Sequence, residues 1–395
     1  MISRDMESRL KLLAGQFPVV ILTGPRQSGK STLCKAVFTG LSYSTLESPD
    51  VRAFALEDPR GFLAQFPKGA ILDEIQNCPE LCSYLQEIID RDPAPGRWIL
   101  TGSQNLSVIE STSQSLAGRA AVLRLLPMSR GEVARFEVFP RALNETLLTG
   151  GYPRILDWKL KPSDWLASYV ATYLERDVRT LSNIGDLSAF QRFVQLCAGR
   201  ISQLLNFSSL ASDCGVSQPT AKSWLSVLEA SFITFRLPSY YGNISKRLIK
   251  MPKLHFYDSG LACWLLGIRD SEQLAVHPLW GAIFESWVVS EIIKGRFNRG
   301  ESNGCYFFRD KAGLESDALM QTGETITLVE AKAGQTISSD MAASLEQIAK
   351  LFASTKKTVA PVVVYGGPET QTRNGITYLA WHEIQNHLWT REVEG

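Results

Sequence analysis

The sequence lacks the features that mark several large classes of protein. Its seven cysteines form no C-x-x-C pair, and with only four histidines they offer no zinc-finger spacing. No apolar run reaches the roughly 18 residues of a membrane span, and the acidic start leads into an amphipathic helix. We therefore expect reduced core thiols in a soluble, cytoplasmic protein that does not enter the membrane.

An excess of charge of either sign is also missing. Lys and Arg total 41 and Asp and Glu total 40, which gives a net charge of +1. A global cationic field, which would indicate a nucleic-acid binder, is therefore excluded, and any such surface must be local. The sequence also contains no internal repeat, no low-complexity segment and no long block of charge.

The length of the chain predicts more than one domain. A chain of 395 residues with 45% hydrophobic content fits two or three domains at roughly 150 residues each. Up to about residue 135, apolar runs alternate with helical patterns, which is typical of a parallel sheet covered by helices on both faces. The predicted strands are Phe17–Thr23, Leu41–Leu46, Ala70–Asp73, Trp98–Gly102 and Ala121–Leu126.

The pattern changes twice along the rest of the chain. Residues 140–200 show helical spacing, which predicts a helical lid. Residues 200–260 have the pattern of a helix, a Gly-containing turn, a second helix and a hairpin. From about residue 277 a helix, three strand-like runs, a second helix and the apolar strand Val359–Tyr365 predict a mixed α/β domain. We set the predicted domains at 1–200, 201–266 and 267–395.

A glycine-rich loop follows the first apolar run and opens a helix. It has the pattern G-x-x-x-x-G-K-[ST], in which backbone N–H groups surround a phosphate, the lysine reaches phosphate oxygens and the hydroxyl holds Mg²⁺. The strand before it and the helix after it distinguish a phosphate-binding loop from a plain glycine turn. The residues predicted to bind nucleotide are Gly24, Pro25, Arg26, Gln27, Ser28, Gly29, Lys30, Ser31 and Thr32.

Two neighbouring acids end the third predicted strand. Asp73 is placed to complete a Mg²⁺ shell with Ser31, and Glu74 is placed to orient a water for attack on the γ-phosphate. This pair favours hydrolysis of ATP over a small-molecule kinase. Ser103 and Gln104 end the next strand, where a polar side chain either senses the γ-phosphate or forms an ordinary turn.

Three arginines are candidates for stabilising the charge that develops during hydrolysis. Arg119 follows Leu116-Ala117-Gly118, Arg154 follows Gly150-Gly151-Tyr152-Pro153, and Arg176 lies in Glu175-Arg176-Asp177. An arginine supplied across a subunit interface is a common solution, whereas an unselected arginine is usually a solvated charge. We select Arg119 and expect a homo-oligomer, for which a hexameric ring is one form.

These motifs together resemble the AAA-type ATPases of bacteria and archaea that carry a C-terminal domain of unknown function. The resemblance extends from the phosphate loop and Leu72-Asp73-Glu74-Ile75-Gln76 to Lys253-Leu254-His255-Phe256-Tyr257-Asp258-Ser259-Gly260-Leu261, so it covers nearly the whole chain. It implies an AAA+ core of the P-loop NTPase class, a winged helix and a C-terminal nuclease-like module. It does not imply a known biological task.

The middle of the chain predicts a helix-turn-helix. Gly215 suits the tight turn, Ser217 caps the second helix and Pro219 fits its first turn. Basic residues follow on the predicted wing, and they favour phosphate contact. The residues predicted to contact DNA are Gln218, Thr220, Lys222, Lys246 and Arg247, with Asn243, Lys250 and Lys253 near the wing. The alternative is a packing module with a solvated basic face.

The C-terminal region holds acids on a helix and two strands. Glu285 lies on the helix, Asp317 on one strand, and Glu330 and Lys332 share one face of the next. Such carboxylates would hold Mg²⁺ or Mn²⁺ while the lysine activates a water. The set resembles the PD-(D/E)XK nuclease fold, with Asp317 and Glu330 as metal ligands, although this fold also hosts modules that do not cleave. Basic residues that would hold a phosphodiester are Arg296, Arg299, Arg309 and Lys311.

The leading hypothesis is a cytoplasmic, Mg²⁺-dependent AAA+ ATPase that acts on DNA, with a C-terminal module that binds or cuts a strand. The rival is an ATP-dependent protein remodeller or regulatory switch whose C-terminal domains are adaptors. Stimulation of the ATPase by DNA distinguishes the two.

Overall fold

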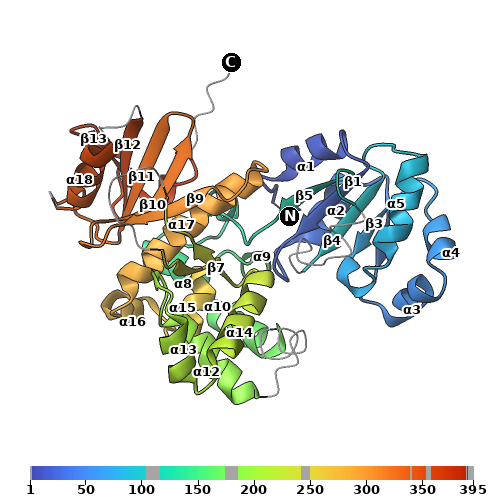
Figure 1. Cartoon of the computed structure of the whole chain (residues 1–395), viewed down its shortest axis with the longest axis horizontal. Coiled ribbons are helices and arrows are strands. Elements are labelled where there is room, and N and C mark those ends of the chain that lie inside the picture. The colour runs from blue at the N-terminus through green and yellow to red at the C-terminus, as the bar shows by residue number, and fades with distance from the viewer. Residues whose placement is uncertain are drawn as a thin grey trace. The chain divides into compact units, whose positions relative to one another are not determined.

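The computed structural model describes residues 2–103, 116–173, 186–241, 250–338, 340–352, 357–387 and 389 (Figure 1). The chain divides into two compact units. The first unit comprises Met1–Pro127, Ala230–Phe232 and Arg296–Glu301, and the second comprises Met128–Glu229, Ile233–Gly295 and Ser302–Gly395.

The first unit is built on a parallel sheet, as the alternation of apolar runs predicts. Its strands lie in the order β2-β3-β4-β1-β5, and every neighbouring pair is parallel. The strands are β1 (Val19–Thr23), β2 (Ser42–Thr45), β3 (Ala70–Asp73), β4 (Trp98–Gly102) and β5 (Ala120–Arg124). The predicted runs at both ends of the series extend beyond these strands, because apolar residues continue into the adjoining turns.

Helices cover this sheet on both faces. Val19 and Ile21 of β1 belong to one buried cluster, and Val20 and Leu22 belong to the other. Since successive side chains of a strand point to opposite faces, β1 is covered on both sides. The helices are α1 (Glu7–Ala14), α2 (Lys30–Val37), α3 (Pro49–Glu57), α4 (Pro59–Ala64) and α5 (Leu81–Arg91), with the short η1 (Ile75–Asn77) after β3.

The second unit begins with helices, as residues 140–200 predict, and continues with a small antiparallel sheet of order β6-β8-β7. Its first helices are α7 (Arg130–Val133), α8 (Leu143–Thr149), α9 (Pro153–Asp157), α10 (Pro162–Tyr169) and α12 (Leu187–Ala198). The following elements are β6 (Gln203–Leu204), α13 (Phe207–Cys214), α14 (Gln218–Ala230), β7 (Thr234–Leu237), β8 (Lys253–Phe256), α15 (Ser259–Leu265) and α16 (Ser271–Val276).

A mixed sheet of order β13-β14-β12-β11-β10-β9 completes the second unit. The strands are β9 (Cys305–Arg309), β10 (Glu315–Thr322), β11 (Thr325–Lys332), β12 (Thr358–Tyr365), β13 (Gln371–Arg373) and β14 (Ile376–Ala380). The helices are α17 (Trp280–Asn298), α18 (Ala343–Phe352) and the short η4 (Trp381–Glu383). Leu345, Ile348 and Phe352 of α18 pack into the core of this sheet. The strands β13 and β14 were not among the predicted elements.

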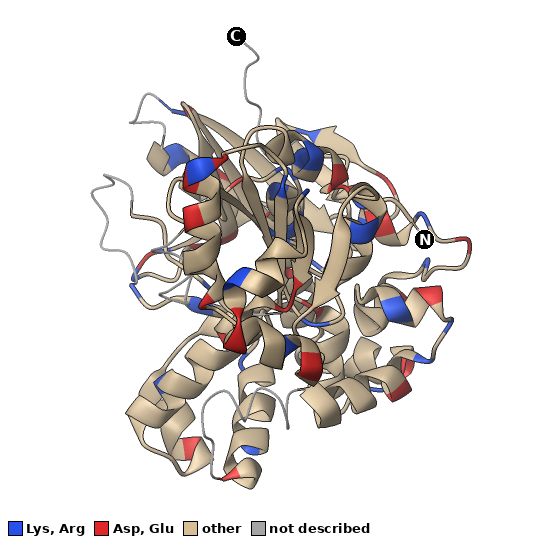
Figure 2. Cartoon of the chain, turned by 90° about the vertical axis from the view of Figure 1, so that its right-hand side faces the viewer, with Lys and Arg blue, Asp and Glu red and all other residues tan. Residues whose placement is uncertain are grey.

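The cysteines and the charged residues bear on two expectations from the composition. All seven cysteines are buried and none forms a disulfide, as predicted. Basic and acidic residues are interspersed along the ribbon in Figure 2, in keeping with the balanced composition. Among the helices that the structure describes, none is long and apolar enough to cross a bilayer.

Candidate functional site

The glycine-rich loop between β1 and α2 has a backbone that needs its glycines. Gly24 has φ 153°, Gly29 has φ 94° and Gln27 has φ 67°. The loop therefore has positive φ angles at three positions, a backbone conformation that residues with a side chain rarely adopt. A Cβ atom on Gly24 would lie 2.1 Å from the carbonyl oxygen of Leu125. Only glycine fits there, and the loop is thereby held against the residue that follows β5.

Lys30 is folded onto this loop. Its Nζ donates to the carbonyl oxygens of Gly24 and Pro25 at 2.9 Å each, and its side chain is buried. Burial lowers the pKa of Lys30, against the opposing effect of Glu74 and Asp73. The loop therefore contains a cation that interacts with weak, neutral acceptors, which an anionic group could replace.

Arg4 holds the loop through hydrogen bonds to backbone carbonyls, a role that was not predicted from the sequence. Its Nη1 donates to the carbonyl oxygen of Ser28 at 2.7 Å and its Nη2 to that of Leu126 at 2.9 Å. The Ser28 hydroxyl is buried and has no hydrogen-bond partner among the described residues. A cradle that admits no Cβ, an unpaired hydroxyl and a buried ammonium fit the phosphates of a nucleotide.

Asp73 is held by hydroxyl groups from three elements. It accepts from Ser31 Oγ at 2.9 and 3.0 Å and from the Tyr43 hydroxyl at 2.6 Å, and it also accepts from Thr101 Oγ1. Burial and the bond to Asp73 raise the pKa of Tyr43. Ser31 and Asp73 are therefore brought together, as predicted for two ligands of one Mg²⁺. Tyr43 and Thr101 were missed, because a hydroxyl on a strand carries no signal of its own.

Glu74 lies just beyond β3 with φ 57° and ψ 48°. Its Oε2 accepts from the backbone N–H of Ser103 at 3.2 Å and from Gln76 Nε2, which also donates to Ser103 Oγ at 3.2 Å. The unusual backbone conformation and these bonds fix the carboxylate beside the end of β4. Ser103 is thus brought to Glu74, whereas Gln104 lies outside the described residues.

The three candidate arginines have different surroundings. Arg119 Nε lies 2.6 Å from Asp90 Oδ1 within the first unit, and this pairing lowers the pKa of Asp90. Arg154 stacks over Trp158, with Cζ 4.3 Å from the ring centroid. Arg176 lies outside the described residues. Arg119 would have to leave Asp90 to act on a nucleotide.

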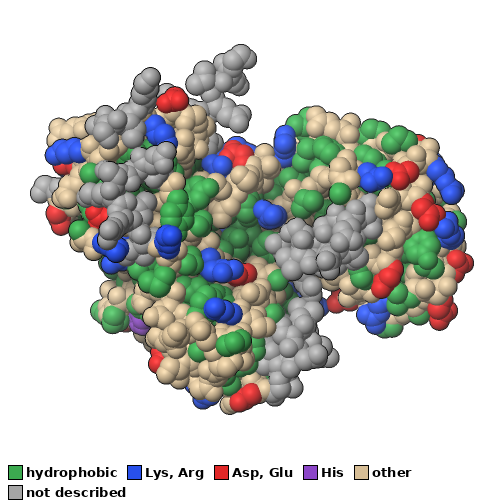
Figure 3. Space-filling model, viewed as in Figure 1, with side chains coloured by type: hydrophobic (Ala, Val, Ile, Leu, Met, Phe, Trp, Pro, Cys, Tyr) green, Lys and Arg blue, Asp and Glu red, His purple; other side chains and the backbone are tan. Residues whose placement is uncertain are grey.

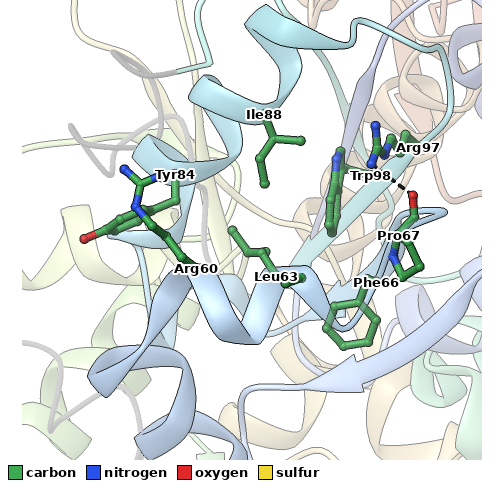
Figure 4. Close-up of a pocket in the computed structure, with 9 residues that line it drawn as sticks. Arg60, Leu63, Phe66, Pro67, Tyr84, Ile88, Arg97 and Trp98 are labelled. Atoms are coloured by element: carbon green, nitrogen blue, oxygen red, sulfur yellow. Dashed lines mark hydrogen bonds between the residues drawn. The ribbon is translucent and has the colours of Figure 1, made fainter.

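A separate pocket of the first unit lies between α4, α5 and β4 (Figure 4). Leu63, Ile88 and Trp98 form its apolar walls, and Arg97 Nη2 donates to the carbonyl oxygen of Pro67 at 3.0 Å. Its volume of about 260 Å³ is below the range usual for ligand pockets. None of the phosphate-loop residues lines it, so it is not part of the candidate nucleotide site.

The helix-turn-helix forms as α13, a turn at Gly215 with φ 73°, and α14. Ser217 Oγ accepts from the backbone N–H of Thr220 at 3.2 Å, which makes it the predicted cap, and it also bonds the Thr220 hydroxyl at 2.7 Å. Gln218 and Lys222 are exposed, while the apolar residues of the motif, Leu210, Trp224, Leu225 and Leu228, are buried. The winged-helix assignment remains a prediction.

The basic residues of the predicted wing do not form one surface in the described part of the chain. Lys250 is exposed. Lys253 lies on β8 beside β7 but is only 3% exposed, so its predicted contribution to a basic DNA-binding surface is wrong. Asn243, Lys246 and Arg247 lie outside the described residues. On the face shown in Figure 3, blue and red side chains are interspersed.

Lys253 instead enters the predicted acid cluster of the second unit. Its Nζ lies 2.7 Å from Glu285 Oε1 and 3.5 Å from Asp317 Oδ1, and it also forms an ion pair with Glu315. Burial lowers the pKa of Lys253, but the three carboxylates outweigh it and the net shift is upward. A protein ammonium thus lies where the sequence predicted a metal ion.

Glu330 and Lys332 lie close together, as expected for two residues on one face of a strand, and they form an ion pair that was not predicted. Lys332 Nζ lies 2.7 Å from Glu330 Oε1, and Asp317 Oδ2 accepts from the backbone N–H of Ala331 at 2.9 Å. Burial, and then the neighbouring Asp317, raise the pKa of Glu330 to about 8; burial likewise raises that of Glu285. Among the described residues, no group of three or more acids, histidines or cysteines is arranged to hold a metal ion.

The basic residues predicted beside this cluster are engaged by acids of the same chain. Arg309 Nη1 lies 2.8 Å from Glu315 Oε2, and Arg299 Nε lies 2.5 Å from Glu301 Oε1. Arg296 also pairs with Glu301. These contacts compete with a bound phosphodiester. Lys311 is exposed, and its role stays a prediction.

Family models match three successive parts of the chain. Residues 16–134 match a model described as "AAA domain". Residues 140–272 match "Domain of unknown function (DUF8612)", and residues 280–384 match "Domain of unknown function (DUF4143)".

Uncharacterized proteins of Mycobacterium tuberculosis and Mycobacterium bovis are each 30% identical to this chain over 321 residues, which is 80% of this chain and 71% of each relative. Among solved structures, a Walker-type ATPase of Pyrococcus abyssi matches 67% of this chain and 96% of its own at 16% identity, with a TM-score of 0.40. AMPPCP-bound DnaA from Aquifex aeolicus matches 57% of this chain and 85% of its own at 14% identity, with a TM-score of 0.30.

Proposed function

Because the chain belongs to the same family as the two mycobacterial proteins and carries an AAA-type P-loop ATPase domain, we propose that it hydrolyses ATP with Mg²⁺ in the cytoplasm and applies the resulting conformational cycle to DNA. The observation that carries the hydrolysis proposal is the geometry at the ends of β1, β3 and β4. Lys30 rests on neutral carbonyls, Asp73 is held by Ser31, and Glu74 is fixed beside Ser103.

Each group of the loop has a role in this proposal. The backbone of residues 24–32 surrounds the phosphates, Lys30 leaves the carbonyls of Gly24 and Pro25 to pair with phosphate oxygens, and Ser31 and Asp73 hold Mg²⁺. The metal ion would neutralise charge on the phosphates. Glu74 orients the attacking water, and Ser103 positions Glu74 through its backbone N–H.

The DNA part of the proposal rests on the exposed face of α14, with Gln218 and Lys222 available to phosphates and Thr220 already bonded to Ser217. The test is the rate of ATP hydrolysis without DNA and with single-stranded, duplex, forked and junction DNA. We expect at least one DNA to accelerate turnover, and Lys222→Glu to weaken DNA binding and flatten its salt dependence. Lys350→Glu, on the exposed side of α18, is the matched charge control.

A protein remodeller is the second candidate. It is favoured by the burial of Lys253, which removes this residue from the predicted basic surface. Turnover that responds to none of the DNA structures, together with unchanged DNA binding in Lys222→Glu, would support this candidate instead.

We further propose that Arg119 acts on a nucleotide held by a neighbouring copy in a homo-oligomer, of which a hexameric ring is one form. Its pairing with Asp90 is exposed to solvent and therefore weakly held. Mixing inactive Arg119→Ala with inactive Glu74→Gln should restore part of the activity, because one interface then contains both intact groups. A lack of rescue at every mixing ratio would argue against a shared site.

For the C-terminal module we propose a nuclease-like fold that binds DNA without cutting it. Lys253 pairs with the acids that would otherwise hold a metal ion. Parent and Asp317→Ala proteins would be incubated with single-stranded, duplex and flapped DNA in Mn²⁺, with and without ATP, and Mn²⁺ binding would be followed by calorimetry. We expect no cleavage. Cleavage by the parent alone would restore the prediction that Asp317 and Glu330 are metal ligands with Glu285 and Lys332 assisting.

A further inference from the structure

A pocket of about 680 Å³ lies in the second unit, and none of the residues of the three predicted sites lines it. Its buried floor includes Arg130, Leu143, Gly366 and Trp381, and its exposed rim includes Arg141, Gln335 and His382. Its volume is in the range of sites for small ligands. The lining contains two arginines and one histidine, and no acid among the described residues.

Arg130 is the unusual member of this lining. Its side chain is 7% exposed, and its Nε and Nη1 are buried without a hydrogen-bond partner among the described residues. Its Cζ lies 5.0 Å from the ring centroid of Phe139 and 5.2 Å from that of Trp381. Rings stabilise a cation through their faces, but they do not satisfy N–H donors that point along the plane of the guanidinium group.

Glu291, the acid whose charge acts on Arg130, does not complete the site. Glu291 raises the pKa of Arg130 against the lowering effect of burial. However, its carboxylate already accepts from the backbone N–H of Arg130 at 2.7 Å, from Lys294 Nζ at 2.8 Å and from Gln385 Nε2 at 2.7 Å. The charge of Glu291 is therefore balanced by Lys294, and Nε and Nη1 of Arg130 remain without a partner among the described residues.

We propose that this pocket binds a small oxyanion attached to a flat apolar group, such as an aryl carboxylate or an aryl phosphate. The oxyanion pairs with the guanidinium group of Arg130, and the flat group lies against Phe139 and Trp381, which also line the pocket. Arg141, whose Cζ lies 5.5 Å from the Phe139 centroid, adds a second positive charge at the rim. This site shares no residue with the nucleotide loop.

The test measures binding of benzoate, phenyl phosphate and inorganic phosphate to the full chain by calorimetry. A Lys30→Ala background keeps the phosphate loop from contributing. We expect saturable binding of at least one aryl anion, and the benzoate and phenyl phosphate arms distinguish a carboxylate from a phosphate ligand. Arg130→Met should weaken binding by roughly 10- to 100-fold, the loss expected for hydrogen bonds to a charged group.

Two controls separate a ligand site from a structural arginine. Arg135→Met, which changes an exposed arginine outside the pocket lining, should leave binding within about twofold. Arg130→Met should melt at or above the temperature of the parent, because it removes a buried cation whose Nε and Nη1 have no partner among the described residues. The proposal is overturned if no probe binds saturably, if Arg130→Met binds as well as the parent, or if Arg130→Met fails to fold.

Discussion

The two units each combine a buried lysine with carboxylates, but they do so in opposite ways. In the first unit Lys30 donates to the carbonyls of Gly24 and Pro25 while Asp73 accepts from hydroxyls, so cation and carboxylate are kept apart. In the second unit Lys253 lies directly on Glu285 and close to Asp317. The first arrangement leaves both charges available to a nucleotide and a metal ion. In the second arrangement the opposite charges pair with one another. We therefore expect them to stabilise the fold of the unit rather than to take part in catalysis.

The largest expected effect concerns the first arrangement. Glu74→Gln should lower ATP turnover by roughly 10²- to 10⁴-fold while nucleotide binding persists, because the residue acts on water and not on phosphate. Lys30→Ala should instead abolish nucleotide binding. Steady-state hydrolysis and nucleotide titration measure the two effects, with the exposed Glu57→Gln as control. Equal turnover in Glu74→Gln and the parent would remove Glu74 from the site.

The second arrangement predicts a change in stability. Lys253→Ala should destabilise the second unit by about 3–5 kcal/mol, because it leaves buried carboxylates without their counterion. Lys250→Ala, which changes an exposed lysine three positions earlier, should change stability by less than about 0.5 kcal/mol. Urea unfolding compares the two. A Lys253→Met/Glu285→Gln double variant should recover part of the loss, and similar midpoints for both single variants would contradict the role of Lys253.

The same cluster predicts a dependence on pH. The folded pKa of Glu330 is raised to about 8 from its ordinary value of 4.5, so the folded chain holds a proton that the unfolded chain releases. Stability from this group is complete below pH 4.5 and is lost as the pH rises toward 8, by at most about 1.4 kcal/mol per pH unit. Glu330→Gln should flatten the profile of unfolding free energy between pH 5 and 8. A profile that rises with pH in the parent would oppose this assignment.

A smaller effect tests the hydroxyl groups around Asp73. Thr101→Val keeps the shape of the side chain and removes its donor, so it should cost about 1 kcal/mol, or roughly fivefold in the Mg²⁺ concentration needed for half-maximal turnover. Tyr43→Phe should act in the same direction. Unaltered Mg²⁺ dependence in both variants would show that Ser31 alone positions Asp73.

The sequence was most informative where function depends on neighbours in the chain. The phosphate loop needs Gly24, Gly29 and Lys30 in one turn, and the closeness of Glu330 and Lys332 follows from the two-residue period of a strand. Both features could be predicted from the sequence, and both are present in the structure. The parallel order of the first sheet was expected as well, although the order of its strands was not.

Contacts between distant segments could not be predicted in this way. Arg4 reaches Ser28 and Leu126 only because α1 packs against the sheet, and Lys253 reaches Glu285 only because β8 is buried. On the sequence alone, Lys253 was one more basic residue after a helix-turn-helix. Which residue a side chain pairs with, and therefore whether it is buried, depends on how the whole unit packs.

The glycine pair at 150–151 and the segment after β8 illustrate how tightly the second unit is connected. Asp258 Oδ2 accepts from the backbone N–H of Gly151 at 2.7 Å, and a Cβ atom on Gly150 would lie 2.3 Å from Asp258 Oδ1. During synthesis, the helices before residue 200 must therefore wait for residue 258 to emerge before this contact can form. A nascent chain that reaches only residue 272, where one family model ends, would still lack Glu285, Glu315 and Asp317, the ion-pair partners of Lys253. Folding of this half of the molecule is thus expected to be completed only after its last sheet has been made.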